Sequence, residues 1–161
     1  NSIQIIGKRL GTDTRAAELI RKIRKSLFQR GNLPNGAKVS PKVLLIADRD
    51  PDRLKTMYII GTRGFLNEIL ELVGARNAYS GNIPYPSISV DSVSSMNPDI
   101  IIDFTFTKSK EAKEKIKRSW DRYQMIRAVR NRKIIFAEGD FWQKPGPRIG
   151  LIADELRRIL Y

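Results

Sequence analysis

The stretch Ile134–Leu160, IIFAEGDFWQKPGPRIGLIADELRRIL, decides how the fold is inferred from the sequence. Its short apolar run, Ile134–Ala137, predicts a buried strand, and the amphipathic segment Ile149–Leu160 predicts the last helix. The connection Glu138–Arg148 ends in Pro-Gly-Pro-Arg, which fixes the backbone ahead of the helix and excludes a regular strand ladder. The stretch therefore predicts a strand, a rigid loop and a helix in succession.

The loop also carries side chains that a simple turn does not need. Phe141 and Trp142 are adjacent large aromatics, and they lie between an acid, Asp140, and a cation, Lys144. Loops on a rigid scaffold commonly carry binding residues. We therefore expect the tip of this loop to recognise a ligand, with the alternative that Trp142 completes the hydrophobic core.

Upstream of this stretch, short apolar runs alternate with helical patterns. Strands are predicted at 42–47, 57–60 and 100–104, and helices at 65–73, 89–96 and 109–120. Ser89 and Ser109 are suitable N-caps for two of these helices, and Gly74 is a suitable C-terminal cap for the first. Strands separated by helices predict an α/β three-layer sandwich with a mostly parallel central sheet.

The first residues differ in kind from the rest. Ile3–Leu10 and Thr14–Phe28 both have helical periodicity, and Gly11 predicts a break between them. Gly31–Pro41, with two prolines and two glycines, predicts a loop. We therefore expect a helical lead-in over residues 1–36 and an α/β lobe over residues 37–161.

Composition narrows the class of protein. The 161 residues suffice for one domain, and no apolar run is long enough to span a membrane. No export signal is visible at the start, although a signal or lipid anchor could have been removed. The net charge of +13 favours an anionic partner, with a merely well-solvated surface as the alternative.

The absence of Cys and His excludes several kinds of site. Thiol nucleophiles, disulfides, zinc sites and imidazole bases all need one of these residues, so a metal could be ligated only by Tyr, Asp, Glu or Met. No P-loop, G-x-S-x-G or G-x-G-x-x-G motif is present. Asp48, Asp50 and Asp52 lack the rest of a calcium loop, and we interpret them as a surface loop. We expect no enzyme and no intrinsic cofactor.

The residues alone leave two alternative functions open, each from a different class of protein. A basic nucleic-acid-binding α/β domain would suit the charge, although no nucleic-acid motif is present. A phosphate- or dinucleotide-binding enzyme is hinted at only by Gly61–Gly64, whose backbone amides at a helix start could bind an anion.

Four segments, taken together, resemble the C-terminal lobe of the substrate-binding proteins of ABC importers for ferric siderophores, haem and cobalamin. They are FLNEILELVGARNAYSG (Phe65–Gly81), IPYPSISVDSV (Ile83–Val93), NPDIII (Asn97–Ile102) and AVRNRKIIFAEGDFWQKPGPRIGLIADEL (Ala128–Leu156). Their order and spacing are similar to the family from about Lys42 to the C-terminus. The opening helical residues look like the end of the helix that joins the family's two lobes.

The resemblance implies two α/β lobes joined by a rigid helix, with a metal chelate held in the cleft between them. The sequence departs from the family in lacking the N-terminal lobe, which a longer protein, another chain or a second copy would supply. The resemblance places Tyr58, Tyr85, Asp140 and Lys144 beside the cleft, with Trp142 between the last two.

The resemblance also implies partners and a location. An acid on the short helix that contains Asp91 docks on the membrane permease in this family. The expected ligand is a ferric siderophore, haem or cobalamin. The expected location is the periplasmic or extracellular face of the cytoplasmic membrane, with a lipid anchor as one way of holding the protein there.

Overall fold

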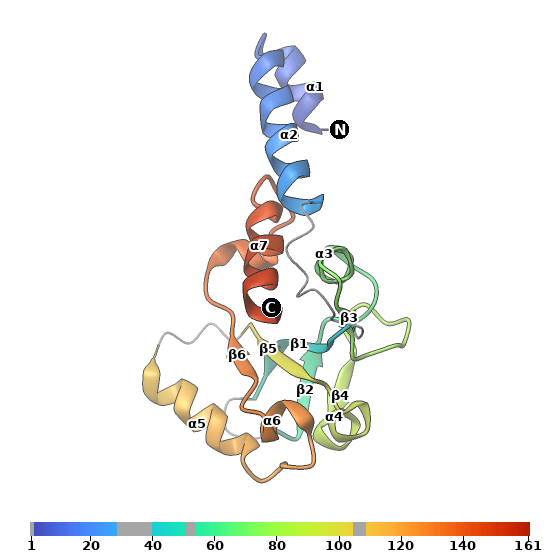
Figure 1. Cartoon of the computed structure of the whole chain (residues 1–161), viewed down its shortest axis with the longest axis vertical. Helices are drawn as coiled ribbons and strands as arrows, with labels where there is room; N and C mark the ends of the chain where they lie inside the picture. The colour runs from blue at the N-terminus through green and yellow to red at the C-terminus, as the bar shows by residue number, and fades with distance from the viewer. Residues whose placement is uncertain (1, 29–39, 51–53, 105–108) are drawn as a thin grey trace.

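The computed structural model of the chain describes residues 2–28, 40–50, 54–104 and 109–161, and its sheet lies between two layers of helices (Figure 1). The elements in chain order are α1 (Ser2–Arg9), α2 (Asp13–Phe28), β1 (Lys42–Arg49), β2 (Thr56–Ile59), α3 (Phe65–Leu72), β3 (Arg76–Asn77), β4 (Ser87–Ser89), α4 (Val90–Met96), β5 (Ile100–Asp103), α5 (Lys110–Trp120), α6 (Arg127–Arg130), β6 (Ile134–Phe136), η1 (Asp140–Gln143) and α7 (Ile149–Leu160).

The sheet is built around β1, whose consecutive apolar residues are buried on both faces. The strand order is β4-β2-β1-β5-β6, and β3 also pairs with β1. β3, β5 and β6 run parallel to the strands they pair with, whereas β2 pairs antiparallel with both β1 and β4. The sheet is thus mostly parallel, with an antiparallel portion at one side.

Each face of the sheet buries its own hydrophobic cluster. Leu45 and Ile102 face the cluster formed with α3, α7 and Trp142. Leu44 and Ile101, one residue earlier along each strand, face the cluster formed with α4, α5 and α6. The alternation of side chains along the strands therefore accounts for the three layers.

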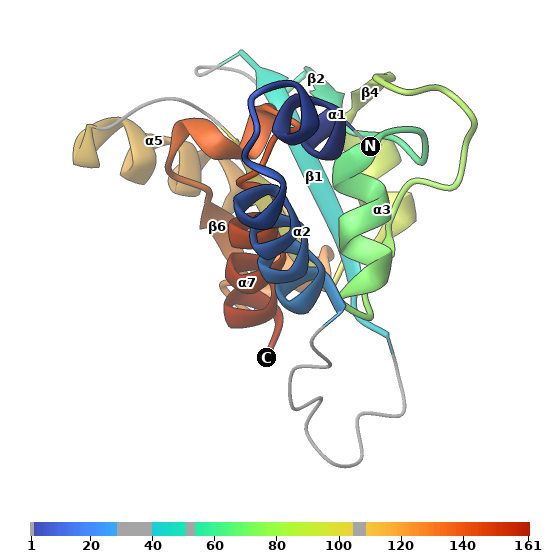
Figure 2. The same cartoon turned by 90° about the horizontal axis from the view of Figure 1, so that it is seen from above.

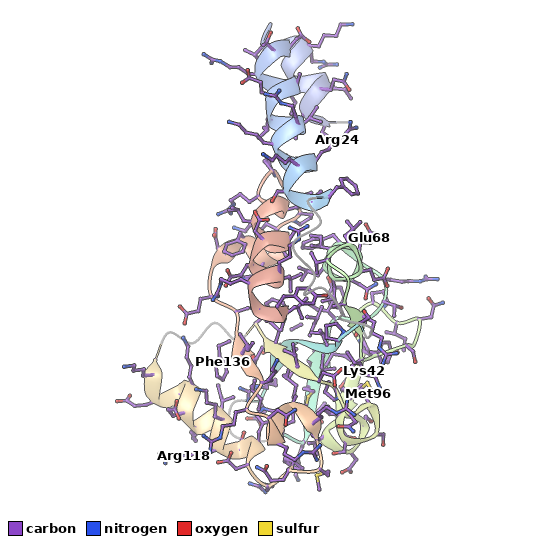
Figure 3. The ribbon with its side chains drawn as sticks, in the orientation of Figure 1. Arg24, Lys42, Glu68, Met96, Arg118 and Phe136 are labelled. Carbon is purple, nitrogen blue, oxygen red and sulfur yellow. The ribbon has the colours of Figure 1, made fainter. Side chains whose placement is uncertain are left out.

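Helices α1 and α2 form a hairpin that extends beyond α7, with side chains projecting into solvent along most of its length (Figures 1 and 3). Gly7 allows the two helices to approach closely, since a Cβ there would lie 2.4 Å from the Cβ of Ala16. Gly11, at φ +62°, makes the turn between them.

The end of α2 packs against α7 (Figure 2). Ser26 Oγ lies 2.6 Å from Asp154 Oδ2 and 2.9 Å from the Gly150 carbonyl oxygen. The guanidinium of Arg157 donates to the carbonyls of Ser26 (2.7 Å) and Leu27 (2.8 Å), which are among the last acceptors of α2. The hairpin is thereby anchored to the lobe.

Most predicted elements are confirmed. The last helix has the predicted bounds, and the hydroxyls of Ser89 and Ser109 accept hydrogen bonds from the first turns of α4 and α5. Gly74 has φ +88° directly after α3. The α/β three-layer class is therefore confirmed.

Three further features complete the fold. Between Trp120 and Val129 the chain forms mostly turns, and only α6 is helical there. The region 77–86 begins within β3 and leads into β4, two strands too short to give a periodic signal in the sequence. β2 runs antiparallel because its link from β1 is too short for a crossover. The predicted loop at 31–41 and the boundary at 36/37 lie almost entirely outside the described residues.

Candidate ligand-binding site

The carboxyl ends of the parallel strands define one edge of the sheet, here called the carboxyl edge. β1, β5 and β6 are parallel, so the segments that follow Arg49, Asp103 and Phe136 leave the sheet together. β2 begins at the same edge with Thr56 (Figure 2, upper part). In open α/β sheets ligands bind at this edge.

Two predicted site residues, Tyr58 and Tyr85, lie on the same face of the sheet. Tyr58 lies opposite Ser87 in the pairing of β2 with β4. This pairing continues before β4, because the Gly61 amide donates to the Pro84 carbonyl over 2.8 Å. Side chains alternate along an extended chain, so Tyr85 faces the same way as Ser87 and hence as Tyr58. The register brings these two tyrosines together.

Both rings are available to a ligand. Tyr58 is 53% exposed and Tyr85 is 61% exposed. Tyr85, in the bend before β4, lies opposite Ile60 and so diagonal to Tyr58. Diagonal residues lie about 7–8 Å apart, a separation at which aromatic side chains can touch the same molecule. Two exposed phenol rings on one face form an aromatic surface that can stack on a flat ligand.

A hydrogen-bond network fixes the loop that carries Tyr85. The side-chain amide of Asn77 donates to the Ile60 carbonyl and to Asn67 Oδ1, each over 3.0 Å. Thr62 Oγ1 donates to the Gly81 carbonyl over 2.7 Å. The turn after β2 and the loop before β4 are therefore tied to each other, which holds the two tyrosines in place.

The loop around η1 supplies the charged side of the site. Arg148 binds Asp140 through both carboxylate oxygens, at 2.9 and 3.1 Å, and Lys144 Nζ lies 3.9 Å from Asp140 Oδ2. The hydrogen bonds from Arg148 lower the pKa of Asp140, so this carboxylate stays ionised at neutral pH. All three side chains are exposed. Since Arg148 already holds Asp140, the cation that a ligand meets is chiefly Lys144.

The two sides of the site are separated by the width of the sheet. From β2, with Tyr58, to β6, which leads into η1, there are three strand spacings of about 4.8 Å, or roughly 14 Å. This separation suits a large chelate or macrocycle better than a single small anion.

Trp142 lies in the hydrophobic core. It is 1% exposed, its Nε1 donates to the Glu138 carbonyl over 3.1 Å, and its ring lies 5.3 Å from the rings of Phe104 and Phe141. The sequence left open whether this indole binds ligand or completes the core. The structure favours the second alternative, because no ring face is exposed for stacking.

Asp91 lies in the first turn of α4, directly after β4, and its side chain is exposed. Helix α4 covers the sheet face opposite to the two tyrosines. The position is thus near the carboxyl edge but separate from the aromatic surface, as a contact to a second protein would require.

Two features were missed from the sequence. Asp48, interpreted as a loop residue, belongs to β1 and lies directly opposite Tyr58. Arg49 and Asp103 form a buried ion pair, with Nε 2.6 Å from Oδ2 and side chains 1% and 0% exposed. No local pattern signals either feature, because both depend on which strands become neighbours.

Within the described residues, no group of three or more acidic side chains could hold a metal ion. No helix described here is both long and apolar enough to cross a membrane.

Comparison with known proteins finds a relative among bacterial substrate-binding proteins. The chain is 25% identical over 165 residues to YvrC of Bacillus subtilis, described as an uncharacterized ABC transporter substrate-binding lipoprotein, with 99% of this chain and 49% of YvrC covered. This chain therefore spans about half the length of that relative.

Solved structures share the fold. A possible iron-binding, periplasmic solute-binding protein of Staphylococcus epidermidis superposes with a TM-score of 0.79 at 28% identity, over 99% of this chain and 60% of that one. The periplasmic haem-binding protein RhuT of Roseiflexus sp. RS-1 superposes with a TM-score of 0.76 at 20% identity, over 99% and 60%.

The sequence pattern of the family described as periplasmic binding protein matches residues 1–140, which is most of the chain. The α/β lobe architecture and this match agree with each other. The chain belongs to the periplasmic binding protein family.

Proposed function

We propose that this chain forms one wall of the binding cleft in the substrate-binding component of an ABC importer for a metal chelate: a ferric siderophore, haem or cobalamin. The observation that carries the proposal is the placement of Tyr58 and Tyr85, two exposed side chains in the continued pairing of β2 with the segment that leads into β4, across the sheet from Lys144. The iron-binding and haem-binding descriptions of two structural relatives support this ligand class.

The chemistry of the two sides suits such ligands. The tyrosine rings can stack on a macrocycle or a catecholate, and the Lys144 ammonium can pair with the negative charge of a ferric chelate. Neither contact makes or breaks a covalent bond. The role is capture and release of the ligand, not catalysis.

A second wall is needed to enclose the ligand. Ile5, Ile6 and Leu10, on α1 and in the turn after it, are each more than half exposed. Apolar side chains gathered on a projecting hairpin are typical of a surface that another domain covers. We infer that the other lobe of a longer protein rests there, with a second copy of this chain as the alternative.

The location follows from this role. An importer collects its ligand outside the cytoplasmic membrane, so we place the protein in the periplasm or at the extracellular face. The lipoprotein description of YvrC supports attachment to the membrane. The direct partner there is the permease.

Replacing Tyr58 or Tyr85 by Ala is expected to weaken binding of a ferric siderophore or haemin by about 5- to 30-fold each, as loss of 1–2 kcal/mol per stacked ring implies. Titration of the purified protein followed by quenching of its fluorescence measures the affinity. Met125→Ala, at a side chain that is also 61% exposed but lies between α5 and α6, is the matched control. Equal affinity in the tyrosine variants and the control would remove the basis of the proposal.

Reversing the charge of Asp91 with Asp91→Lys is expected to lower ligand uptake severalfold and to leave ligand affinity unchanged. A rim charge governs the encounter with a partner more than the contact with a ligand held elsewhere. Uptake into membrane vesicles that contain the permease measures the first quantity, and titration measures the second. Glu111→Lys, at an exposed acid on α5, is the control. Unchanged uptake, or a loss of ligand affinity, contradicts the docking role.

A further inference from the structure

The chain from the last turn of α5 to the start of β6 is strongly basic. Over residues 118–133 it holds five arginines and one lysine but a single acid, Asp121. All six cations are exposed to solvent. We call them the arginine cluster: Arg118, Arg122, Arg127, Arg130, Arg132 and Lys133. The segment is therefore a concentrated source of positive charge on the surface.

The α6 part of the cluster lies at the edge of the sheet opposite to the candidate site, here called the amino edge. Ile134 begins β6 and pairs with Ile101 of β5, so Lys133 and the turn before it lie where the parallel strands begin. Arg118, in the last turn of α5, lies at the same end of the molecule as α6, far from the α1–α2 hairpin (Figure 3). A partner bound to the cluster would leave the carboxyl edge free.

Helix α6 presents its arginines from a rigid base. Ala128 and Val129 are buried, at 0% and 5% exposure. The amide of Ala128 donates to the Pro98 carbonyl over 3.0 Å, and the amide of Arg127 donates to Asn97 Oδ1 over 2.8 Å. The backbone that carries the cations is thus ordered before a partner binds, which reduces the entropic cost of binding.

Arg132 occupies a backbone position that glycine usually fills. Helix α6 ends in a Schellman motif, in which the Lys133 amide donates to the Ala128 carbonyl over 2.7 Å and the Arg132 amide donates to the Val129 carbonyl over 2.9 Å. Arg132 has φ +56°, a left-handed conformation that is unfavourable for a residue with a Cβ. Residues held in such conformations cluster at functional sites. The fold itself would be served equally well by glycine here.

Most of the cluster has no acid to neutralise it. Arg127 pairs with Asp99, and the guanidinium of Arg122 lies 5.9 Å from the centre of the Tyr123 ring. The other four cations form no ion pair with any residue in the described part of the chain. Their hydrogen-bond donors are therefore available to an external acceptor.

We propose that the arginine cluster binds a linear polymer of phosphodiesters that carries no bases and lies outside the membrane. The planar guanidinium group binds phosphate through two parallel hydrogen bonds, which favours arginine over lysine for this anion. The six cations are exposed on turns and on a short helix, so they can follow an extended anion better than they can enclose a single small one. A chain with regularly repeated charges contacts several of them at once.

The aromatic residues beside the cluster do not favour a nucleic acid as the partner. Trp120 is 0% exposed, and the partly buried ring of Tyr123 packs edge-on against it with ring centres 6.2 Å apart. Proteins that bind single strands stack the bases on exposed aromatic rings. Neither ring offers such a surface, so the phosphate backbone is the part of a polymer that this cluster can recognise.

Two observations disfavour a lipid surface. Ile126 and Val129 are buried, which leaves Met125 as the exposed large apolar side chain of the segment. Binding to a membrane surface depends on buried apolar area as well as on charge. The second observation rests on the proposed function: if the carboxyl edge faces the permease, the amino edge points away from the membrane.

Titration of fluorescently labelled poly(glycerol phosphate) with the purified chain, followed by anisotropy at several salt concentrations, tests the inference. If all six cations are engaged, the logarithm of the binding constant is expected to fall with the logarithm of the salt concentration with a slope of about −4. Arg132→Gly is expected to weaken binding about 5-fold and to reduce the magnitude of this slope by roughly 1. Because glycine adopts this φ without strain, its melting temperature is expected to be unchanged or higher. Arg9→Ala, at an exposed cation on α1, is the control.

Equal weakening by Arg132→Gly and Arg9→Ala would overturn the inference, because only the overall charge would then matter. A lower melting temperature of Arg132→Gly would contradict it too, since the arginine would then serve the fold. Tighter binding of single-stranded DNA with the same number of phosphates would replace it with a nucleic-acid function. Binding to phosphatidylglycerol vesicles without binding to the polymer would replace it with membrane attachment.

A titration with haemin keeps this inference apart from the proposed function. Arg132→Gly is expected to bind haemin with unchanged affinity, because Arg132 lies at the opposite edge from the two tyrosines. A chain that binds haemin but no polymer refutes only the arginine cluster as a binding surface. A chain that binds the polymer but no metal chelate refutes only the proposed function.

Discussion

Replacing Asp103 by Ala is expected to destabilise the chain by about 3–5 kcal/mol, the cost of leaving one charge of a buried ion pair without its partner. Arg49 and Asp103 are almost completely inaccessible to solvent, and they join β1 to β5 at the carboxyl edge. The remaining guanidinium would be buried and uncompensated. The free energy of unfolding, measured by urea denaturation followed by circular dichroism, gives the result.

A double substitution distinguishes the cost of an unpaired buried charge from the cost of lost packing at the same positions. Arg49→Met with Asp103→Leu removes both charges and keeps apolar volume, and it is expected to recover most of the lost stability. Glu114→Ala, which breaks an exposed pair with Lys117, is the control and is expected to cost about 0–1 kcal/mol. A single substitution at Asp103 that costs no more than Glu114→Ala contradicts the assignment of a buried pair.

Trp142→Ala is expected to cost about 3–5 kcal/mol, because it removes the largest side chain between η1 and the sheet. For a chain of this length that corresponds to a fall in melting temperature of roughly 6–20 °C. Trp142→Phe keeps a ring against Phe104 and Phe141 and loses the hydrogen bond to Glu138, so it is expected to cost less. Thermal unfolding followed by circular dichroism measures both variants.

The same experiment distinguishes core from binding surface. Tyr85→Ala, at an exposed ring, is expected to change the melting temperature little while weakening ligand binding. Trp142→Ala is expected to do the reverse when affinity is measured well below its melting temperature. An unchanged melting temperature for Trp142→Ala would show that the indole is not part of the core.

Local sequence pattern predicted the elements whose causes are local. The apolar run of β1 and the periodicity of α7 are properties of neighbouring residues, and both were inferred with nearly the observed bounds. The hydroxyl caps at Ser89 and Ser109 follow from a single side chain and the first turn of its helix. Such features need no knowledge of the tertiary fold.

The features that sequence reasoning missed depend on pairing between distant segments. β4 is three residues long and is a strand only because β2 lies beside it. The neighbours of Asp48 are set by a shift in register after Ile46, which no local pattern announces. Trp142 looked equally suited to a core or a ligand, and only the positions of Phe104 and Phe141 decide between them.

The hydrogen bonds between the end of α2 and helix α7 fix how far the α1–α2 hairpin projects from the lobe. Arg157 grips two carbonyls of α2, and α7 starts at the residue after Arg148, beside the charged loop. A domain that packs on the far end of this hairpin is therefore held at a fixed distance and orientation relative to the candidate site. One residue inserted into α2 would rotate the far end of the hairpin by about 100° around the helix axis. Seven inserted residues would nearly restore the original orientation and move that end outward by about 10 Å. In the proposed two-walled cleft, the number of helical turns in α2 would therefore set the separation of the two walls.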